Sequence, residues 1–193
     1  MNLIIIYAGE YNMSYYDTIY EYAADNYGLI TSAAAKVLDI PNVELVKLSH
    51  RGRLTRLGHG VYRIEHYIPT PQDKYAEAIA LAGNDAYIYG ESVLAMHGLA
   101  YVNPNVIYVA TPKRVRKKLS PYIRIIQRDE GEKVVSYEGI PSQSVFAAIL
   151  SCRNTVMTER LEDAVAEAER QGLITKDEAS KARNELIDGR QSA

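Results

Sequence analysis

Residues 29–64, which read LITSAAAKVLDIPNVELVKLSHRGRLTRLGHGVYRI, constrain the fold of this chain more than any other stretch. Thr31 can cap a helix with its hydroxyl oxygen. Asp39-Ile40-Pro41 then ends that helix, because the residue before a proline is pushed out of the helical region. Asn42 is expected to cap a second helix, which Gly52 stops by adopting a left-handed conformation. The stretch therefore begins with two short helices joined by a tight turn.

A β-hairpin is expected to follow these two helices. Residues 53–57 alternate as in a strand, residues 58–60 contain two glycines that permit a turn, and residues 61–64 form the return strand. Upstream, Ser14 can cap a helix over 14–26, which would pack behind the pair and complete a three-helix core. Three helices followed by a hairpin predict a winged helix-turn-helix.

The charges of this stretch suit a nucleic-acid partner. Between residues 45 and 64 there are five Lys or Arg residues and no Asp or Glu. Leu45 and Leu48 lie three residues apart, so they share one face of the second helix and leave the basic residues for a DNA groove. The candidate DNA-binding residues, taken over the two helices and the hairpin, are Thr31, Ser32, Lys36, Asn42, Lys47, His50, Arg51, Arg53, Thr55, Arg56, His59 and Arg63.

Each basic residue has a simpler alternative interpretation, which is an ordinary solvated charge on a helix or hairpin. The hairpin residues are expected to meet phosphate or a minor groove. Glu44 is the one acid nearby, and it can either accept a hydrogen bond from a cytosine or interact with the N-terminus of its own helix.

The whole chain limits the other possibilities. Its 193 residues carry a net charge of −2, so any DNA binding must come from a local patch rather than from bulk attraction. The single cysteine, Cys152, excludes an internal disulfide, and we expect it to be a buried thiol in the cytoplasm. No stretch is long and apolar enough for a membrane span. Residues 1–13 are either an extra arm or an extension upstream of a natural start at Met13.

A second domain is expected after a stiff connector. Residues 67–72 contain two prolines, so we place a linker there between a first domain over 14–66 and a second domain over 73–193. The second domain mixes strands and helices and ends in helices, which makes the whole chain α+β. Strands are expected over 86–89, 106–110, 122–127 and 134–137. Helices are expected over 72–82 and 91–97, and a third helix ends at residue 150 and starts at residue 142 or 144. Two further helices are expected, one capped by Thr158 and one capped by Thr175.

Nothing in the sequence indicates an enzyme. The four histidines have no metal-ligand spacing, and His97 is expected to be a packed or capping residue. There is no nucleophile elbow, no phosphate-binding loop and no pair of carboxylates suited to Mg²⁺. We expect no catalytic residue, no metal and no cofactor.

The sequence resembles the AbiEi-type antitoxins of bacterial type IV toxin–antitoxin systems and the transcriptional regulators that share their domain. The resemblance rests on residues 29–64 quoted above and on YGESVLAMHGL at 89–99, VIYVATP at 106–112 and YEGIPSQSVFAAIL at 137–150. It spans nearly everything after Met13.

The resemblance implies a winged helix that binds double-stranded operator DNA and represses its own operon, as a monomer or weak dimer on inverted repeats. It also implies an abortive-infection, or phage-defence, role in which the second domain counters a nucleotidyltransferase toxin without forming a stable complex. The alternatives are a stand-alone winged-helix regulator and a protein-interaction module with no toxin partner.

A second basic segment lies in the second domain, with no acid within it. It can extend the DNA footprint, serve neutralisation of the toxin, or simply form a charged, solvated loop. Its residues are Lys113, Arg114, Arg116, Lys117, Lys118, Arg124 and Arg128.

Overall fold

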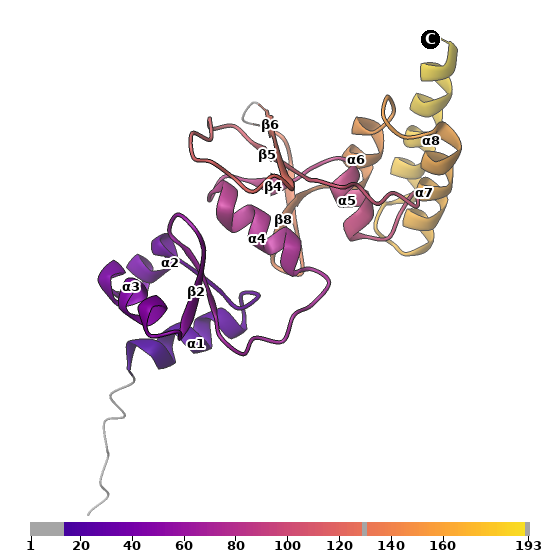
Figure 1. The fold of residues 1–193 in the computed structure, drawn as a ribbon. Coiled ribbons are helices and arrows are strands. Elements are labelled where there is room, and N and C mark those ends of the chain that lie inside the picture. Colours follow the sequence, from indigo (N-terminus) through magenta and orange to yellow (C-terminus); the bar gives the residue numbers. More distant parts are fainter. Residues whose placement is uncertain (1–13, 129–130, 192–193) are drawn as a thin grey trace, which may run out of the picture. The chain divides into compact units, whose positions relative to one another are not determined.

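The computed structural model describes residues 14–128 and 131–191, and the expectations for residues 1–13 lie outside this range. The chain divides into two compact units, with the division between Ile68 and Pro69 (Figure 1). This point falls inside the stretch 67–72 that the prolines mark as a connector. The class is α+β, as predicted, and each unit is described below by itself.

Unit 1 begins with three helices whose ends follow from local sequence. Ser14 caps α1, and Asp17 bonds back to its backbone, which completes a capping box. Thr31 caps α2 by accepting from the Ala34 amide, as predicted. The prediction that Asn42 caps the next helix is wrong, because Pro41 is the N-cap and Asn42 is the first helical residue. The helices are α1 (Tyr15–Ala24), α2 (Ser32–Val37) and α3 (Asn42–His50).

The hairpin is part of a three-stranded antiparallel sheet. Strands β2 (Leu54–Gly58) and β3 (Val61–Ile64) pair as expected, with an irregularity between Arg56 and Gly58. A third strand, β1 (Leu29–Thr31), pairs with the other edge of β3, which gives the order β1-β3-β2. Local sequence patterns do not indicate β1. The added strand fixes the hairpin against the start of α2.

The core of unit 1 joins the helices to one face of this sheet. Ile19 from α1, Leu45 from α3 and Ile30 from β1 are almost completely buried, and they share one cluster. Tyr67 packs against the same cluster. Gly28 has a φ of +69°, and a Cβ there would lie 2.5 Å from the Tyr67 ring, so only glycine fits this position. Tyr67 therefore belongs to the packing of unit 1.

Unit 2 is built on a five-stranded mixed sheet with the order β6-β5-β4-β8-β7. β5 runs parallel to β6 and antiparallel to β4, while β8 runs parallel to β4 and antiparallel to β7. Local sequence patterns do not indicate β8. The strands are β4 (Tyr87–Ile88), β5 (Ile107–Thr111), β6 (Ile123–Gln127), β7 (Val134–Tyr137) and β8 (Ile140–Gln143).

Five helices accompany this sheet. α4 packs against β4, β5 and β8, whereas α6, α7 and α8 pack mainly on one another, with α5 against α6 (Figure 1). Ser144, not Ser142, caps α6. The prediction that Thr158 caps α7 is wrong, because Met157 holds that position without a side-chain bond. The helices are α4 (Asp73–Ala82), α5 (Glu91–Met96), α6 (Val145–Ser151), α7 (Thr158–Arg170) and α8 (Lys176–Gln191).

Across 14–128 and 131–191, no helix is both long enough and apolar enough to cross a membrane.

Candidate DNA-binding face and a second basic segment

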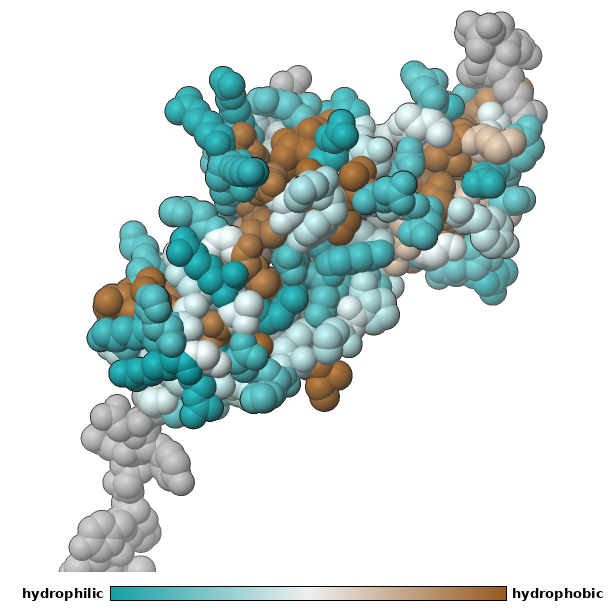
Figure 2. All heavy atoms as spheres, viewed as in Figure 1, coloured by the Kyte–Doolittle hydropathy of each residue, from teal (hydrophilic) through white to brown (hydrophobic). Residues whose placement is uncertain are grey.

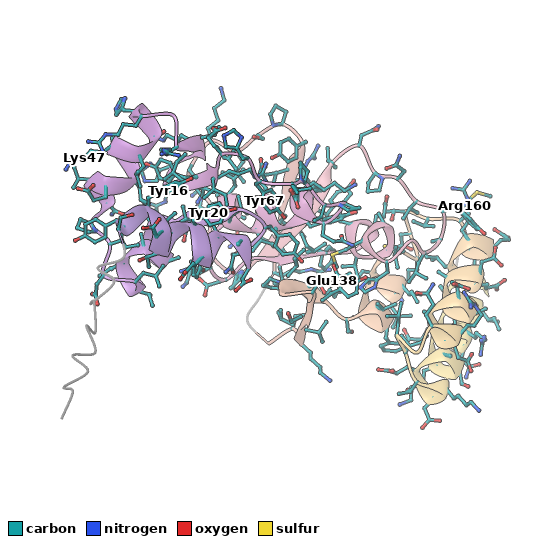
Figure 3. The ribbon with its side chains drawn as sticks, turned by 90° about the horizontal axis from the view of Figure 1, so that it is seen from below. Tyr16, Tyr20, Lys47, Tyr67, Glu138 and Arg160 are labelled. Carbon is teal, nitrogen blue, oxygen red and sulfur yellow. The ribbon has the colours of Figure 1, made fainter. Side chains whose placement is uncertain are left out.

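Helix α3 turns its leucines inward and its basic residues outward. Leu45 and Leu48 are buried, which confirms the prediction from their spacing. Lys47, His50 and Arg51 are exposed, and Lys47 points away from unit 1 (Figure 3). A helix held by two leucines and open on its other side has the geometry needed to enter a major groove.

The exposed charges of α3 are not equivalent. Lys47 Nζ donates to Glu44 Oε1 at 2.7 Å, so the acid of α3 is engaged with a lysine one turn away. The Arg51 side chain makes no ion pair or hydrogen bond within the described ranges, whereas its backbone amide donates to the Lys47 carbonyl. An exposed pair of this kind is worth little, so Lys47 can exchange its partner for a phosphate at small cost.

The hairpin presents three polar residues beside α3. Thr55, Arg56 and His59 are exposed, and Arg56 Nε donates to the Gly58 carbonyl at 3.3 Å. The Thr55 hydroxyl donates to the Glu65 carboxylate, a partner that sequence spacing did not indicate. An acid that directly follows β3, 10 residues after Thr55 along the chain, therefore lies beside the hairpin.

Arg53 and Arg63 lie differently from the other basic residues. The Arg53 guanidinium lies 5.0 Å from the ring centroid of Tyr16 on α1, in cation–π geometry. Arg63 is half-buried, and its Nε and Nη2 atoms are inaccessible to solvent. Its register partner is Thr55, which places both on the same side of the sheet. In this structure Arg63 is therefore not an exposed cation like Arg51 or Arg56.

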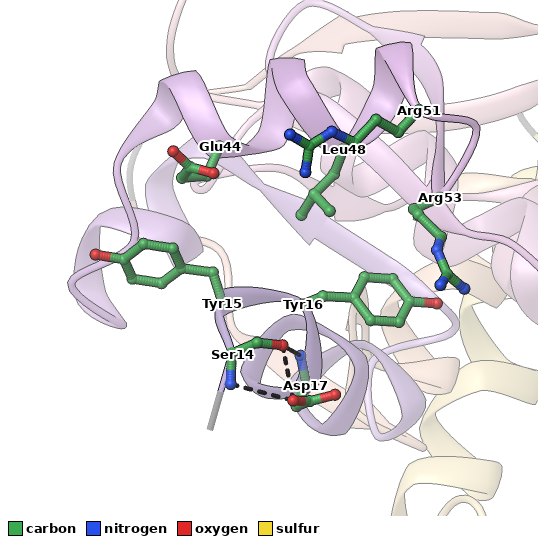
Figure 4. A pocket seen from close by; sticks show the side chains of 8 residues that line it. All are labelled: Ser14, Tyr15, Tyr16, Asp17, Glu44, Leu48, Arg51 and Arg53. Atoms are coloured by element: carbon green, nitrogen blue, oxygen red, sulfur yellow. Dashed lines mark hydrogen bonds between the residues drawn. The ribbon is translucent and has the colours of Figure 1, made fainter. Parts of the chain in front are cut away.

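A groove runs between the start of α1 and α3, with a cavity volume of about 540 Å³ (Figure 4). Asp17 lies in the first turn of α1 and accepts hydrogen bonds from Ser14. The bond from the Ser14 hydroxyl lowers the pKa of Asp17 most, and the bond from the Ser14 amide lowers it further. Arg51 and Arg53 lie along the same groove. The lining residues are Ser14, Tyr15, Tyr16, Asp17, Glu44, Leu48, Arg51 and Arg53.

The residues predicted on and around α2 split into structural and exposed groups. The Thr31 side chain is used as a cap. The Ser32 amide donates to the Gly60 carbonyl at 2.8 Å, which ties the start of α2 to the turn of the hairpin. Lys36 and Asn42 are exposed. Only the last two are accessible without disturbing a contact of the fold.

The second basic segment is also divided by its contacts. Lys113 pairs with Asp85 at 2.7 Å, so an acid absent from the segment itself is supplied from the loop after α4. Arg128 lies over Tyr89 and donates to its hydroxyl. The other five, Arg114, Arg116, Lys117, Lys118 and Arg124, are exposed on the β5–β6 loop and on β6.

A shallow hollow of about 260 Å³ lies at the start of this loop. It is bordered by the turn after α4 and by the basic residues of the loop. Its lining residues are Ala82, Gly83, Asn84, Asp85, Thr111, Lys113, Arg114, Val115, Arg116 and Lys117.

Cys152 and His97, whose side chains could take part in catalysis, are both packed inside unit 2. Burial raises the pKa of the Cys152 thiol to about 12, so it is not a nucleophile at neutral pH. His97 packs on Tyr137 with ring centroids 4.1 Å apart, and burial lowers its pKa. Within the described part of the chain, no three His, Cys, Asp or Glu residues are placed to hold a metal ion.

Comparison with known proteins bears on unit 1. Residues 17–64 match the model of the family described as "Transcriptional regulator, AbiEi antitoxin". The match runs from α1 to the last residue of β3 and includes α3 and the hairpin. No curated protein matches the chain. A transcriptional-regulator domain implies DNA as its partner.

Proposed function

We propose that this protein is a repressor that binds duplex DNA upstream of its own gene through α3 and the β2–β3 hairpin. The observation that carries the proposal is the joint exposure of Lys47, His50 and Arg51 on a helix anchored by two buried leucines. The family match of residues 17–64 supports the same partner.

In this proposal α3 lies in the major groove. Arg51 is positioned for the edge of a guanine or for a phosphate, and Lys47 leaves Glu44 for a phosphate. Arg56 and His59 on the hairpin meet the neighbouring backbone. Repression then follows from occlusion of the promoter, and the protein binds as a monomer or as a weak dimer on an inverted repeat.

We further propose that the protein serves as the antitoxin of a type IV pair, and that unit 2 counters a nucleotidyltransferase toxin without a stable complex. The family description of the N-terminal domain supports the antitoxin role. The second basic segment either extends the DNA footprint or takes part in neutralisation. A stand-alone regulator with no toxin partner is the second candidate.

A gel-shift titration tests the DNA function. The DNA immediately upstream of the gene is compared with a scrambled duplex of equal length at several salt concentrations. We expect specific retardation that weakens steeply with salt, since several phosphates are neutralised. Equal, weak retardation of both duplexes would contradict sequence-specific repression. Coexpression with the neighbouring gene, scored by growth, then tests the antitoxin role separately.

A further inference from the structure

One face of the unit 2 sheet carries aromatic, aliphatic and basic residues. In the β5–β6 register Tyr108 lies opposite Arg124 and Ala110 lies opposite Ile126. Tyr87 pairs with Ala110 on the other side. Because side chains alternate along a strand, these residues share one face, while the fully buried Ile88 and Val109 point to the other.

The packing on this face joins the aromatic residues to arginine. Tyr87, Tyr89 and Ala110 form a small buried cluster of their own, with Tyr108 and Ile126 half-buried against it. The Arg128 guanidinium lies 4.8 Å from the ring centroid of Tyr89. Arg128 itself remains exposed, and its guanidinium also donates to the Tyr89 hydroxyl.

The charge around this face is strongly uneven. Between residues 113 and 128 there are seven cations and no acid, in a chain whose net charge is −2. Asp85 engages Lys113, but the side chains at 114 and 116–118 remain exposed. The Glu132 carboxylate accepts from the Tyr87 hydroxyl and from the Gln143 amide. Over the region of β5 and β6, hydrophilic side chains border hydrophobic ones (Figure 2).

We propose that this face binds single-stranded nucleic acid. The strand backbone follows the exposed cations of the β5–β6 loop, and an unpaired base packs against the exposed Arg128 guanidinium. A neighbouring base meets Tyr108 and Arg124. Guanidinium planes and aromatic rings on a sheet surface recognise bases through their π-faces, which a duplex keeps inside its stack. A duplex therefore offers this face only its phosphates.

This inference is separate from operator binding, because it uses residues of unit 2 alone. It also gives the second basic segment a ligand other than the operator duplex. RNA and DNA strands share the chemistry involved, and the experiment distinguishes them.

The test is fluorescence anisotropy with the full-length protein and a labelled oligoribonucleotide of mixed sequence, about 12 nucleotides long. The same sequence as single-stranded DNA and as an annealed duplex provides the comparison. We expect both single strands to bind at low salt more tightly than the duplex. A tighter RNA complex would assign the 2′-hydroxyl a role in recognition.

Three variants locate the site. The double variant Arg124→Ala/Arg128→Ala should weaken single-strand binding about tenfold or more. Arg128→Lys keeps the charge but loses the planar group, so it should also weaken binding. The control Arg160→Ala removes an exposed arginine from α7, at a distance from β6 along the fold, and should change affinity less than about twofold (Figure 3).

Folding of each variant is checked by circular dichroism and by thermal denaturation. The proposal is overturned if no single strand binds at low salt, or if the folded double variant binds the single strands like the parent protein. Specific binding of the upstream duplex is measured in a separate titration, so either proposal can be contradicted without the other.

Discussion

The two basic regions of the molecule are similar in composition but differ in what supports them. In unit 1, Lys47, His50 and Arg51 project from a helix whose opposite side is fixed by buried leucines. In unit 2, most cations of the second basic segment lie on the β5–β6 loop and on β6, which is an edge strand. A rigid helix can hold side chains in register with base edges, whereas a loop can follow the phosphate backbone of a nucleic acid.

The two regions also differ in how their cations are already used. Glu44 engages one lysine of the α3 face, and Arg53 is drawn over Tyr16. In unit 2, Asp85 engages Lys113 and Tyr89 engages Arg128. A count of cations along the sequence therefore overestimates how many are available to a nucleic acid on either surface. The candidate contacts are the exposed side chains that are not engaged within the protein.

The largest expected effect concerns the support of α3. Leu45→Ala removes a completely buried side chain and should lower the free energy of unfolding by about 2–5 kcal/mol. Urea denaturation followed by tyrosine fluorescence measures this change. The control is Val46→Ala on the same helix, which is 42% exposed and should change stability by less than about 0.5 kcal/mol. Equal losses in both variants would mean that α3 does not pack through Leu45.

A medium effect is expected at the helix caps. Thr31→Ala removes the oxygen that accepts from the Ala34 amide, so the free energy of unfolding should fall by about 1 kcal/mol. Asn42→Ala is the matched control, because Asn42 does not cap α3 and its change should stay within about 0.5 kcal/mol. Thermal denaturation of both variants at neutral pH gives the comparison. A larger loss at Asn42 would contradict the cap assignment.

The smallest effect depends on pH. Hydrogen bonds from Ser14 lower the pKa of Asp17 below its ordinary value of 3.8. Its stabilising contribution is therefore complete above pH 3.8 and is lost as the pH falls through the lowered pKa. Asp17→Asn should reduce thermal stability slightly at about pH 6 and should match the parent protein at about pH 2. A constant difference at both pH values would show that the contribution is not that of the ionised carboxylate.

The elements with local signals were predictable from the sequence. The return strand over 61–64, the buried pair Leu45 and Leu48, and the Thr31 cap all follow from short-range patterns. Helix starts at Asn42 and Thr158 were displaced by one residue, because a cap and a first helical residue differ only in backbone conformation.

The features that escaped prediction depend on distant partners. β1 is a three-residue strand that is defined only by its pairing with β3. β8 contains Pro141, which argues against a strand locally, and its pairing with β4 joins residues far apart in sequence. The pairs Asp85–Lys113 and Tyr16–Arg53 are likewise long-range. These contacts decide which predicted site residues remain exposed, so the candidate site was only partly predictable.

The assignment of α3 and the hairpin as the DNA-binding face is tested most directly with two double variants. Their affinity for the upstream duplex is measured by anisotropy at moderate salt. Arg51→Ala/Arg56→Ala removes one cation from the end of α3 and one from the hairpin, and affinity should fall by about tenfold or more. Arg114→Ala/Arg116→Ala removes the same charge from unit 2 and should have a smaller effect on discrimination between the upstream and scrambled duplexes. Unchanged affinity and discrimination in the first variant would contradict the assignment of α3 and the hairpin as the DNA-binding face.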